Sequence, residues 1–249
     1  MFEKELYEFD TLGYVTFKNI VSAESLDALH YVFDRYRDDP ELVILNSHIG
    51  KKENLPEEQY ISNMIEADQR LHELMRLEPV IDFVRLVMAG NIRVNHSYGI
   101  QRFGSGGYTY LHMGGTPIHP KATYSCVNGK IHSLLTKIVI PVSSTGVEDG
   151  CFAVIPGSHK ANFPRPSGDH PDENKLLVSV EASPGDVIVF SEALCHGSFV
   201  KTTETTRKTF YICYSAGFMP DWGRIGLSHS TEFINSLDAR LKELVKLYD

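Results

Sequence analysis

The hydrophobic spacing of the first ninety residues is that of helices. Apolar side chains recur at helical intervals across residues 22–39, directly after Ser22, whose side chain suits an N-cap. A second helical pattern covers residues 67–90 and is interrupted near Pro79, which lacks a backbone donor. These apolar faces predict a helical layer over residues 1–90 that packs against a sheet.

From about residue 92 the pattern changes to short runs rich in β-branched and aromatic residues. Five such runs are bounded by Gly, Pro, Asp or Ser, at residues 91–103, 133–144, 151–159, 186–191 and 209–218. Successive strands without long helices between them predict an antiparallel sandwich or barrel, with a β core over about 92–220. An amphipathic helix is expected over 230–249, starting near Ser230. The chain shows no internal repeat and no linker-like segment, so residues 1–249 are predicted to form one domain.

Charge and composition narrow the classes of partner. The net charge of −8 and the pI near 5.8 argue against a nucleic-acid partner, which selects a basic surface. No apolar run approaches the ~20 residues that span a bilayer, and the charged N-terminus lacks the apolar core of a secretory signal. The four cysteines have no metal-like spacing, which is typical of reduced thiols. We therefore expect a cytoplasmic protein without nucleic-acid or membrane partners.

Two of the 11 histidines lie next to strand-like runs, where a small barrel brings distant residues to one mouth. His112 follows a glycine-rich turn, and His196 follows the buried run 186–191, 84 positions after His112. A shared first-row metal ion is one interpretation, and two hydrogen-bonded histidines at a sheet edge are the more common one. Arg207 begins a strand and could grip a carboxylate with Ser198 as a further donor. A surface arginine and an exposed turn serine are the ordinary alternatives.

Three segments, in the same order, resemble the phytanoyl-CoA dioxygenase family of iron(II)/2-oxoglutarate oxygenases. They are FDTLGYVTFKNIVSAESLDAL at 9–29, EDGCFAVIPGSHK at 148–160, and PGDVIVFSEALCHGS at 184–198 followed by Arg207. The resemblance covers most of the chain. It implies a double-stranded β-helix, or jelly roll, that is mainly β with flanking helices, in agreement with the hydrophobic pattern.

The resemblance also implies roles for individual residues. His112 and His196 match the two histidines of the family's iron site. Arg207 matches the residue that binds the C5 carboxylate of 2-oxoglutarate, with Ser198 beside it, and Gln101 is expected to contact the cosubstrate. The implied cofactors are Fe(II) and 2-oxoglutarate, with O2 as cosubstrate.

Gly114 departs from the family pattern. The family has His-x-Asp, whereas this chain has His112-Met113-Gly114, and glycine supplies no metal ligand. In this respect the chain resembles the iron/2-oxoglutarate halogenases, in which chloride binds iron at the vacated position. The resemblance implies a radical halogenase that chlorinates an unactivated C–H bond of a small molecule, with Gly114 marking the chloride position.

Two alternatives stay open: a hydroxylase that keeps two-histidine iron or recruits a carboxylate from elsewhere, and a non-catalytic relative that keeps a ligand pocket. Glu192, four residues before His196, is expected to point away from the iron because it ends a strand. Residues 46–60 and 162–175 are expected to wall the substrate pocket. Basic residues in and around 162–175 favour an anionic or zwitterionic small molecule as substrate. The ordinary alternative is that these residues form a solvated loop without a binding role.

Overall fold

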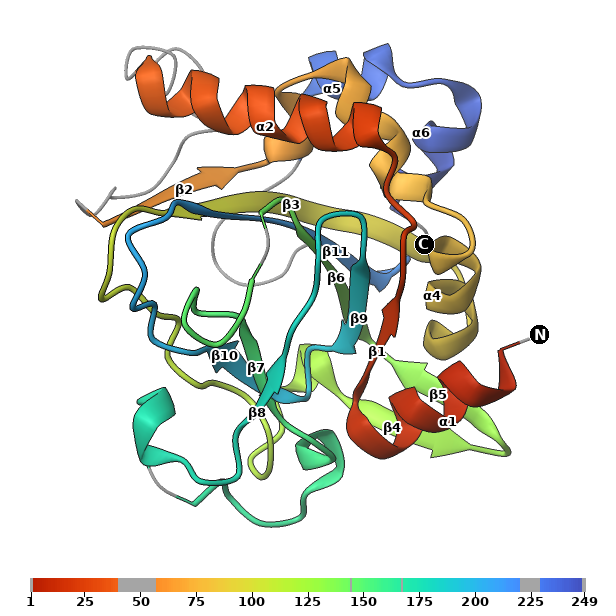
Figure 1. Ribbon diagram of the computed structural model, residues 1–249. Coiled ribbons are helices and arrows are strands. Elements are labelled where there is room, and N and C mark those ends of the chain that lie inside the picture. Colours follow the sequence, from red (N-terminus) through yellow and green to blue (C-terminus); the bar gives the residue numbers. More distant parts are fainter. Residues whose placement is uncertain (1, 40–56, 144, 167, 220–228, 248–249) are drawn as a thin grey trace.

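The computed structural model describes residues 2–39, 57–143, 145–166, 168–219 and 229–247, and two antiparallel sheets form its centre (Figure 1). The larger sheet has the order β1-β9-β6-β11-β3-β2, and the smaller has the order β10-β7-β8. The larger sheet consists of β1 (Tyr14–Phe17), β9 (Val187–Ser191), β6 (Leu135–Pro141), β11 (Arg207–Ala216), β3 (Ile92–Arg102) and β2 (Glu58–Ser62). The smaller sheet consists of β10 (Cys195–Ser198), β7 (Phe152–Ile155) and β8 (Val178–Val180). This arrangement confirms the predicted fold class.

Helices cover one face of the larger sheet, and the smaller sheet lies on the other side (Figure 1). The helices are α1 (Glu3–Leu12), α2 (Ala23–Asp38), α4 (Val80–Met88), α5 (Thr231–Ser236) and α6 (Ala239–Val245), with the 3-10 helices η1 (Met64–Glu66) and η2 (Gln69–Arg76). The main apolar core lies between this layer and the sheet and includes Phe33 of α2, Ile138 of β6 and Phe210 of β11. Each fully buried side chain of this size contributes about 2 kcal/mol to stability.

Helix boundaries follow the local sequence. Ser22 caps α2 and Ser230 caps α5, and each accepts a hydrogen bond from the amide three residues later. The C-terminal helix predicted as one segment is instead two helices. The reason is Asp238, which accepts hydrogen bonds from the amides of Arg240 and Leu241 and so starts α6 as a separate helix.

Two strands lie within the region predicted to be helical. Strands β1 and β2 form the two edges of the larger sheet, where they pair with β9 and β3. The sequence pattern also missed the hairpin of β4 (Tyr124–Val127) and β5 (Lys130–Ser133), which turns at Asn128 and Gly129 with positive φ at both. Most of the predicted pocket wall at 46–60 lies outside the described residues. Among the helices that are described, none has the length and apolar content needed to cross a membrane.

The two faces of the larger sheet have different environments. On β3, Gly99 backs onto Phe33 of α2, whereas Tyr98 faces the smaller sheet and stacks on Tyr211 of β11 with ring centroids 4.5 Å apart. A second apolar cluster, including Val154 of β7, fills part of the space between the sheets. This inter-sheet space also receives the charged side chains described next.

Candidate metal and cosubstrate site

His112 and His196 lie side by side at the edge of the smaller sheet. Residues 109–114 run antiparallel to β10, and His112 and His196 exchange two backbone hydrogen bonds of 3.1 Å. Their ring centroids are 4.1 Å apart. The sheet therefore brings together the two histidines that the sequence separates by 84 positions.

Both imidazole rings have the same tautomer. His112 Nδ1 lies 3.0 Å from Tyr110 O, and His196 Nδ1 lies 2.7 Å from Leu194 O. Because a carbonyl only accepts, each Nδ1 carries the proton and each Nε2 keeps its lone pair. Burial lowers the pKa of His112, against the opposing effect of Glu192, and it lowers the pKa of His196 well below the usual range. Two neutral imidazoles with Nε2 lone pairs are suitable metal ligands.

Glu192 forms a cluster with these histidines, which corrects the prediction that it points away. Its Oε2 lies 3.8 Å from His196 Nε2, and the ligand atoms of His112, Glu192 and His196 all lie within 4.8 Å of one another. A tight turn between β9 and β10, closed by a hydrogen bond from Leu194 N to Ser191 O, brings the carboxylate next to His196. In the part of the chain that the structure describes, no other trio of His, Cys, Asp or Glu side chains has such spacing.

Lys137 of β6 is the cation next to Glu192. Its Nζ lies 2.9 Å from Glu192 Oε2 and 5.6 Å from the centroid of the Tyr98 ring. Both charged side chains are buried, with 7% and 3% of their surface exposed. Burial favours the neutral amine, but Glu192 together with Cys213 and Tyr60 outweighs this effect and raises the pKa of Lys137. The two histidines therefore have a buried ion pair beside them.

Cys195 occupies the space that a side chain at position 114 would need. The φ angle of Gly114 is +76°, and an added Cβ would lie 2.5 Å from Cys195 Cβ and 3.0 Å from Cys195 Cα. Met113 also has a positive φ, of 61°, so the backbone turns immediately after His112. A side chain at position 114 would therefore meet the neighbouring strand, and the chloride position marked by Gly114 stays a prediction.

Two arginines lie opposite each other on β3 and β11, and one of them is paired within the protein. Arg102 donates to Glu58 Oε2 at 2.6 Å, to Ser198 Oγ at 2.8 Å and to Thr109 Oγ1 at 2.6 Å. Ser198 therefore accepts a hydrogen bond from Arg102, and its predicted role beside Arg207 stays a prediction. Within the described residues the Arg207 guanidinium, on a side chain only 5% exposed, has no hydrogen bond or ion pair. Burial lowers its pKa, and an unpaired buried cation of this kind is stabilised by binding an anion.

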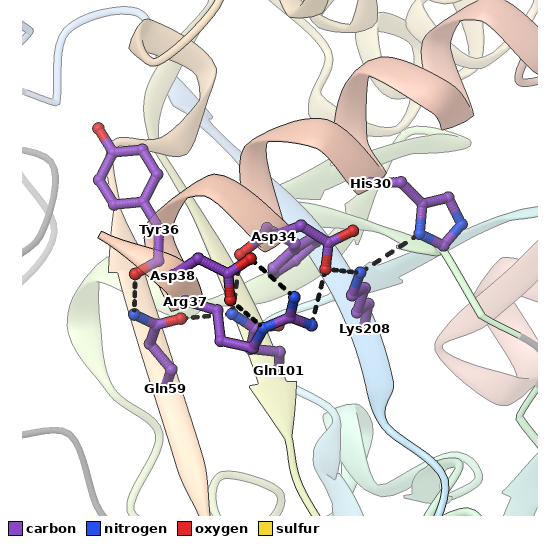
Figure 2. Close-up of polar contacts among 9 residues, drawn as sticks. His30, Asp34, Tyr36, Arg37, Asp38, Gln59, Gln101 and Lys208 are labelled. Carbon is purple, nitrogen blue, oxygen red and sulfur yellow. Dashed lines mark hydrogen bonds and ion pairs between the residues drawn. The ribbon is translucent and has the colours of Figure 1, made fainter. Parts of the chain in front are cut away.

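Gln101 lies on the opposite face of β3, which corrects its predicted contact with the cosubstrate. Its Nε2 donates to Phe33 O of α2 at 3.0 Å and to Gln59 Oε1 of β2, and Gln59 in turn donates to Tyr36 O at 2.8 Å (Figure 2). Residues one position apart on a strand face opposite sides, so Gln101 meets the helices while its neighbour Arg102 faces the inter-sheet space.

A cavity of about 570 Å³ lies along residues 113–120, and none of the three clustered side chains lines it. Its lining includes Met113 and Ala193, which directly follow two of the three clustered side chains, together with Pro164 and Arg165. Arg165 is held in place by Gly168 O at 3.1 Å and by the carboxylate of Asp169. The segment 162–175 thus contributes Pro164 and Arg165 to this cavity, and its role as a wall of the substrate pocket stays a prediction.

A family comparison covers the whole of this site. The family described as Phytanoyl-CoA dioxygenase (PhyH) matches residues 9–209. The chain belongs to this phytanoyl-CoA dioxygenase family. Two curated relatives are the peroxisomal phytanoyl-CoA dioxygenases of Homo sapiens and Mus musculus, each 24% identical over 229 residues that cover 83% of this chain. The chain spans about 65% of the length of these relatives.

Solved structures agree with the jelly-roll fold of the family. HygX from Streptomyces hygroscopicus with nickel and 2-oxoglutarate bound has a TM-score of 0.77 and 22% identity, and the alignment covers 92% of this chain and 93% of HygX. EctD from S. alaskensis with 2-oxoglutarate and 5-hydroxyectoine has a TM-score of 0.65 and 19% identity, with 86% and 76% of the two chains covered. At these identities the likeness shows the fold.

The structure brings three further charged residues, Lys137, Glu192 and Arg102, to the region of the site. Lys137 is a charged residue in the middle of an otherwise apolar strand, which is the one sequence signal that could have drawn attention to it. Glu192 lies four residues before His196, but only the turn between β9 and β10 shows that it faces the histidine. The sequence suggests Arg102 as a candidate donor to chloride near Gly114, whereas the structure pairs it with Glu58, Ser198 and Thr109.

Proposed function

We propose that the chain is an iron(II)/2-oxoglutarate-dependent oxygenase that hydroxylates a small molecule, with His112, His196 and Glu192 holding the iron. The observation that carries this proposal is the cluster of two Nε2 lone pairs and one carboxylate, all within 4.8 Å of one another. Two imidazoles and one carboxylate are the donor set of non-haem iron(II) oxygenases. The Nδ1 contacts with backbone carbonyls keep both rings oriented for ligation.

Arg207 is proposed to bind the C5 carboxylate of 2-oxoglutarate. Its buried guanidinium has no partner in the described residues, and its two forked nitrogens match a carboxylate. Arg102 cannot take this role as readily, because Glu58, Ser198 and Thr109 already occupy its nitrogens. The HygX structure, which shares the fold, holds nickel together with 2-oxoglutarate.

Bound iron would supply the oxidation of a C–H bond by O2, with 2-oxoglutarate as the co-reductant. The residues of this chain bind and orient the reactants and exclude water from the inter-sheet space. Lys137 pairs with the Glu192 carboxylate at 2.9 Å and fixes its position beside the histidines. A HygX structure with hygromycin B bound shows that this fold accommodates a small-molecule ligand.

Chlorination is the second candidate, and one observation favours it. Lys137 already neutralises Glu192, so chloride instead of Glu192 could complete the ligands of a two-histidine iron. The His-x-Gly sequence at Gly114 is consistent with this alternative. The closed direction at Gly114 and the presence of Glu192 beside both histidines favour hydroxylation.

Anaerobic titration with Fe(II) and 2-oxoglutarate, followed by visible absorbance, tests the proposal. A charge-transfer band is expected in the wild-type protein and should form equally with and without chloride. The Glu192→Ala variant should bind Fe(II) at least about 10-fold more weakly, because a ligand is lost. Glu181→Ala, which removes an exposed carboxylate near the end of β8, is the matched control and should behave like wild type.

Three results would contradict the proposal in different ways. No band in any condition would contradict an iron/2-oxoglutarate enzyme of either kind. A band that requires chloride, with Fe(II) affinity unchanged in Glu192→Ala, would favour chlorination. A band lost equally in Glu181→Ala would point to general instability of the variants.

A further inference from the structure

Lys137 gives the inter-sheet space one more positive charge than the proposed iron site needs. Its side chain is 7% exposed, and Glu192 is its ion-pair partner. A lysine ammonium has three donors, and a buried charge must be paired to be tolerated. The flanking Tyr98 ring, with its centroid 5.6 Å from Nζ, offers only the weak attraction of an aromatic face.

The charge balance changes when the cofactors of the proposed function bind. The iron, Arg207 and Lys137 together carry four positive charges. Glu192 and the two carboxylates of 2-oxoglutarate supply three negative charges. The ion pair of Arg102 with Glu58 is already neutral, and both imidazoles are neutral. Among the described residues of this space, one positive charge therefore has no counterpart, whether or not Glu192 remains shared between Lys137 and the metal.

We propose that the substrate brings the missing negative charge as a carboxylate and that Lys137 binds it next to the iron. This inference rests on the proposed function and names the substrate class of the same site. The ion pair supplies the geometric argument: Lys137 Nζ lies 2.9 Å from Glu192 Oε2, so the ammonium already sits beside the acid of the proposed iron site, and it has two further donors for a second carboxylate. A carboxylate is held there by charge-assisted hydrogen bonds, whereas a halide offers one spherical acceptor.

The thermal midpoint of the protein loaded with Ni(II) and 2-oxoglutarate tests the proposal without turnover. Sodium acetate is the probe, and acetamide, which has a similar shape without the charge, is its neutral counterpart. Sodium chloride forms a third arm at the same ionic strength. Acetate should raise the midpoint in proportion to its binding, and acetamide and chloride should not.

Variants of Lys137 assign the effect to this residue. Lys137→Met should weaken acetate binding by about 10- to 100-fold, and Lys137→Arg should retain it because the charge remains. Lys208→Met is the matched control, since Lys208 is also a largely buried lysine paired with an acid. Its partner, Asp34, lies 2.6 Å away on the helical side of the larger sheet (Figure 2). This control should bind acetate like wild type.

Several outcomes would overturn the proposal. Equal effects of acetate and acetamide would show that no charge is recognised. An effect of chloride without an effect of acetate would assign the site to a halide and contradict a substrate carboxylate. If Lys137→Met does not fold, the three arms on the wild-type protein still decide between these results. Failure of Ni(II) and 2-oxoglutarate to raise the midpoint at all would contradict the proposed function, and this inference with it.

Discussion

At the scale of single residues, Gly114 and Glu192 together change the expected chemistry of the site. The sequence shows a missing aspartate at Gly114, and by itself this absence favours chloride as a ligand. In the structure, positive φ angles at Met113 and Gly114 turn the chain so that a side chain at 114 would meet Cys195. A carboxylate is nevertheless present, because Glu192 approaches the histidines from another strand connection.

Replacing Gly114 tests this interpretation through stability. Gly114→Asp should lower the free energy of unfolding by about 3 kcal/mol, since it adds a strained positive φ and forces Cβ against Cys195. Gly106→Asp is the control: its φ is +98°, but no atom lies within 4 Å of an added Cβ, so about 1 kcal/mol is expected. Chemical denaturation measures both. A Gly114→Asp protein as stable as wild type would show that the position is open, as a ligand vacancy requires.

At the scale of elements, strand β3 separates a structural function from a binding function. Gln101 fastens α2 and β2 to one face of the strand through Phe33 O and Gln59. Arg102, one residue later, reaches Ser198 and Glu58 on the other face. The unpaired Arg207 lies opposite Arg102 on β11. Because successive side chains of a strand point to opposite faces of the sheet, Gln101 lies against the helices and Arg102 lies at the site.

Two substitutions should separate these functions. Gln101→Ala should lower the free energy of unfolding by about 2 kcal/mol, because Phe33 O and Gln59 lose a buried partner, and it should leave the KM for 2-oxoglutarate unchanged. Arg207→Gln should raise that KM by about 100-fold with a small effect on stability. Denaturation curves and 2-oxoglutarate turnover measure the two effects. If Gln101→Ala raises the KM for 2-oxoglutarate as much as Arg207→Gln does, Gln101 contacts the cosubstrate and the structural role given to it here is wrong.

Part of the fold and part of the candidate site could be predicted from the sequence, and part could not. The strands β3, β6, β7, β9 and β11, the caps at Ser22 and Ser230, and the fold class follow from local spacing and from three motifs in order. The histidines and Arg207 follow from those motifs as well. The positions of Glu192 and Ser198 depend on a turn and on a cross-sheet contact with Arg102, and neither is encoded by spacing along one strand.

At the scale of the whole molecule, a buried contact between His229 and Glu66 connects the C-terminal helices to the helical layer. His229 Nδ1 lies 2.9 Å from Glu66 Oε1, and both side chains are 1% exposed. Ser230 donates to Glu66 Oε2 through its hydroxyl at 2.7 Å and through its amide at 3.3 Å. Burial pushes the pKa of Glu66 upward, but these hydrogen bonds outweigh it and leave the pKa below its usual value.

The lowered pKa of Glu66 makes stability depend on acid. The contribution of Glu66 to the free energy of unfolding is complete above about pH 5, and it is lost as pH falls through the lowered folded-state pKa. Glu66→Gln should destabilise the protein by about 3 kcal/mol at pH 7, and the difference from wild type should shrink toward pH 3. Glu232→Gln, an exposed acid of α5, is the control and should change little. A constant difference between Glu66→Gln and wild type across this pH range would contradict the assignment.

The paired backbone of His112 and His196 has a consequence for how a metal ion enters this fold. The two residues already close an 84-position stretch of chain through mutual hydrogen bonds, before any ion is present. A metal ion bridging their rings therefore adds little further loss of chain entropy, unlike the metal of a zinc finger, which must order the chain as it binds. If His112 and His196 hold the iron as proposed, metal uptake would be an event of the folded state, and the chain could lose and regain its ion without passing through an unfolded form.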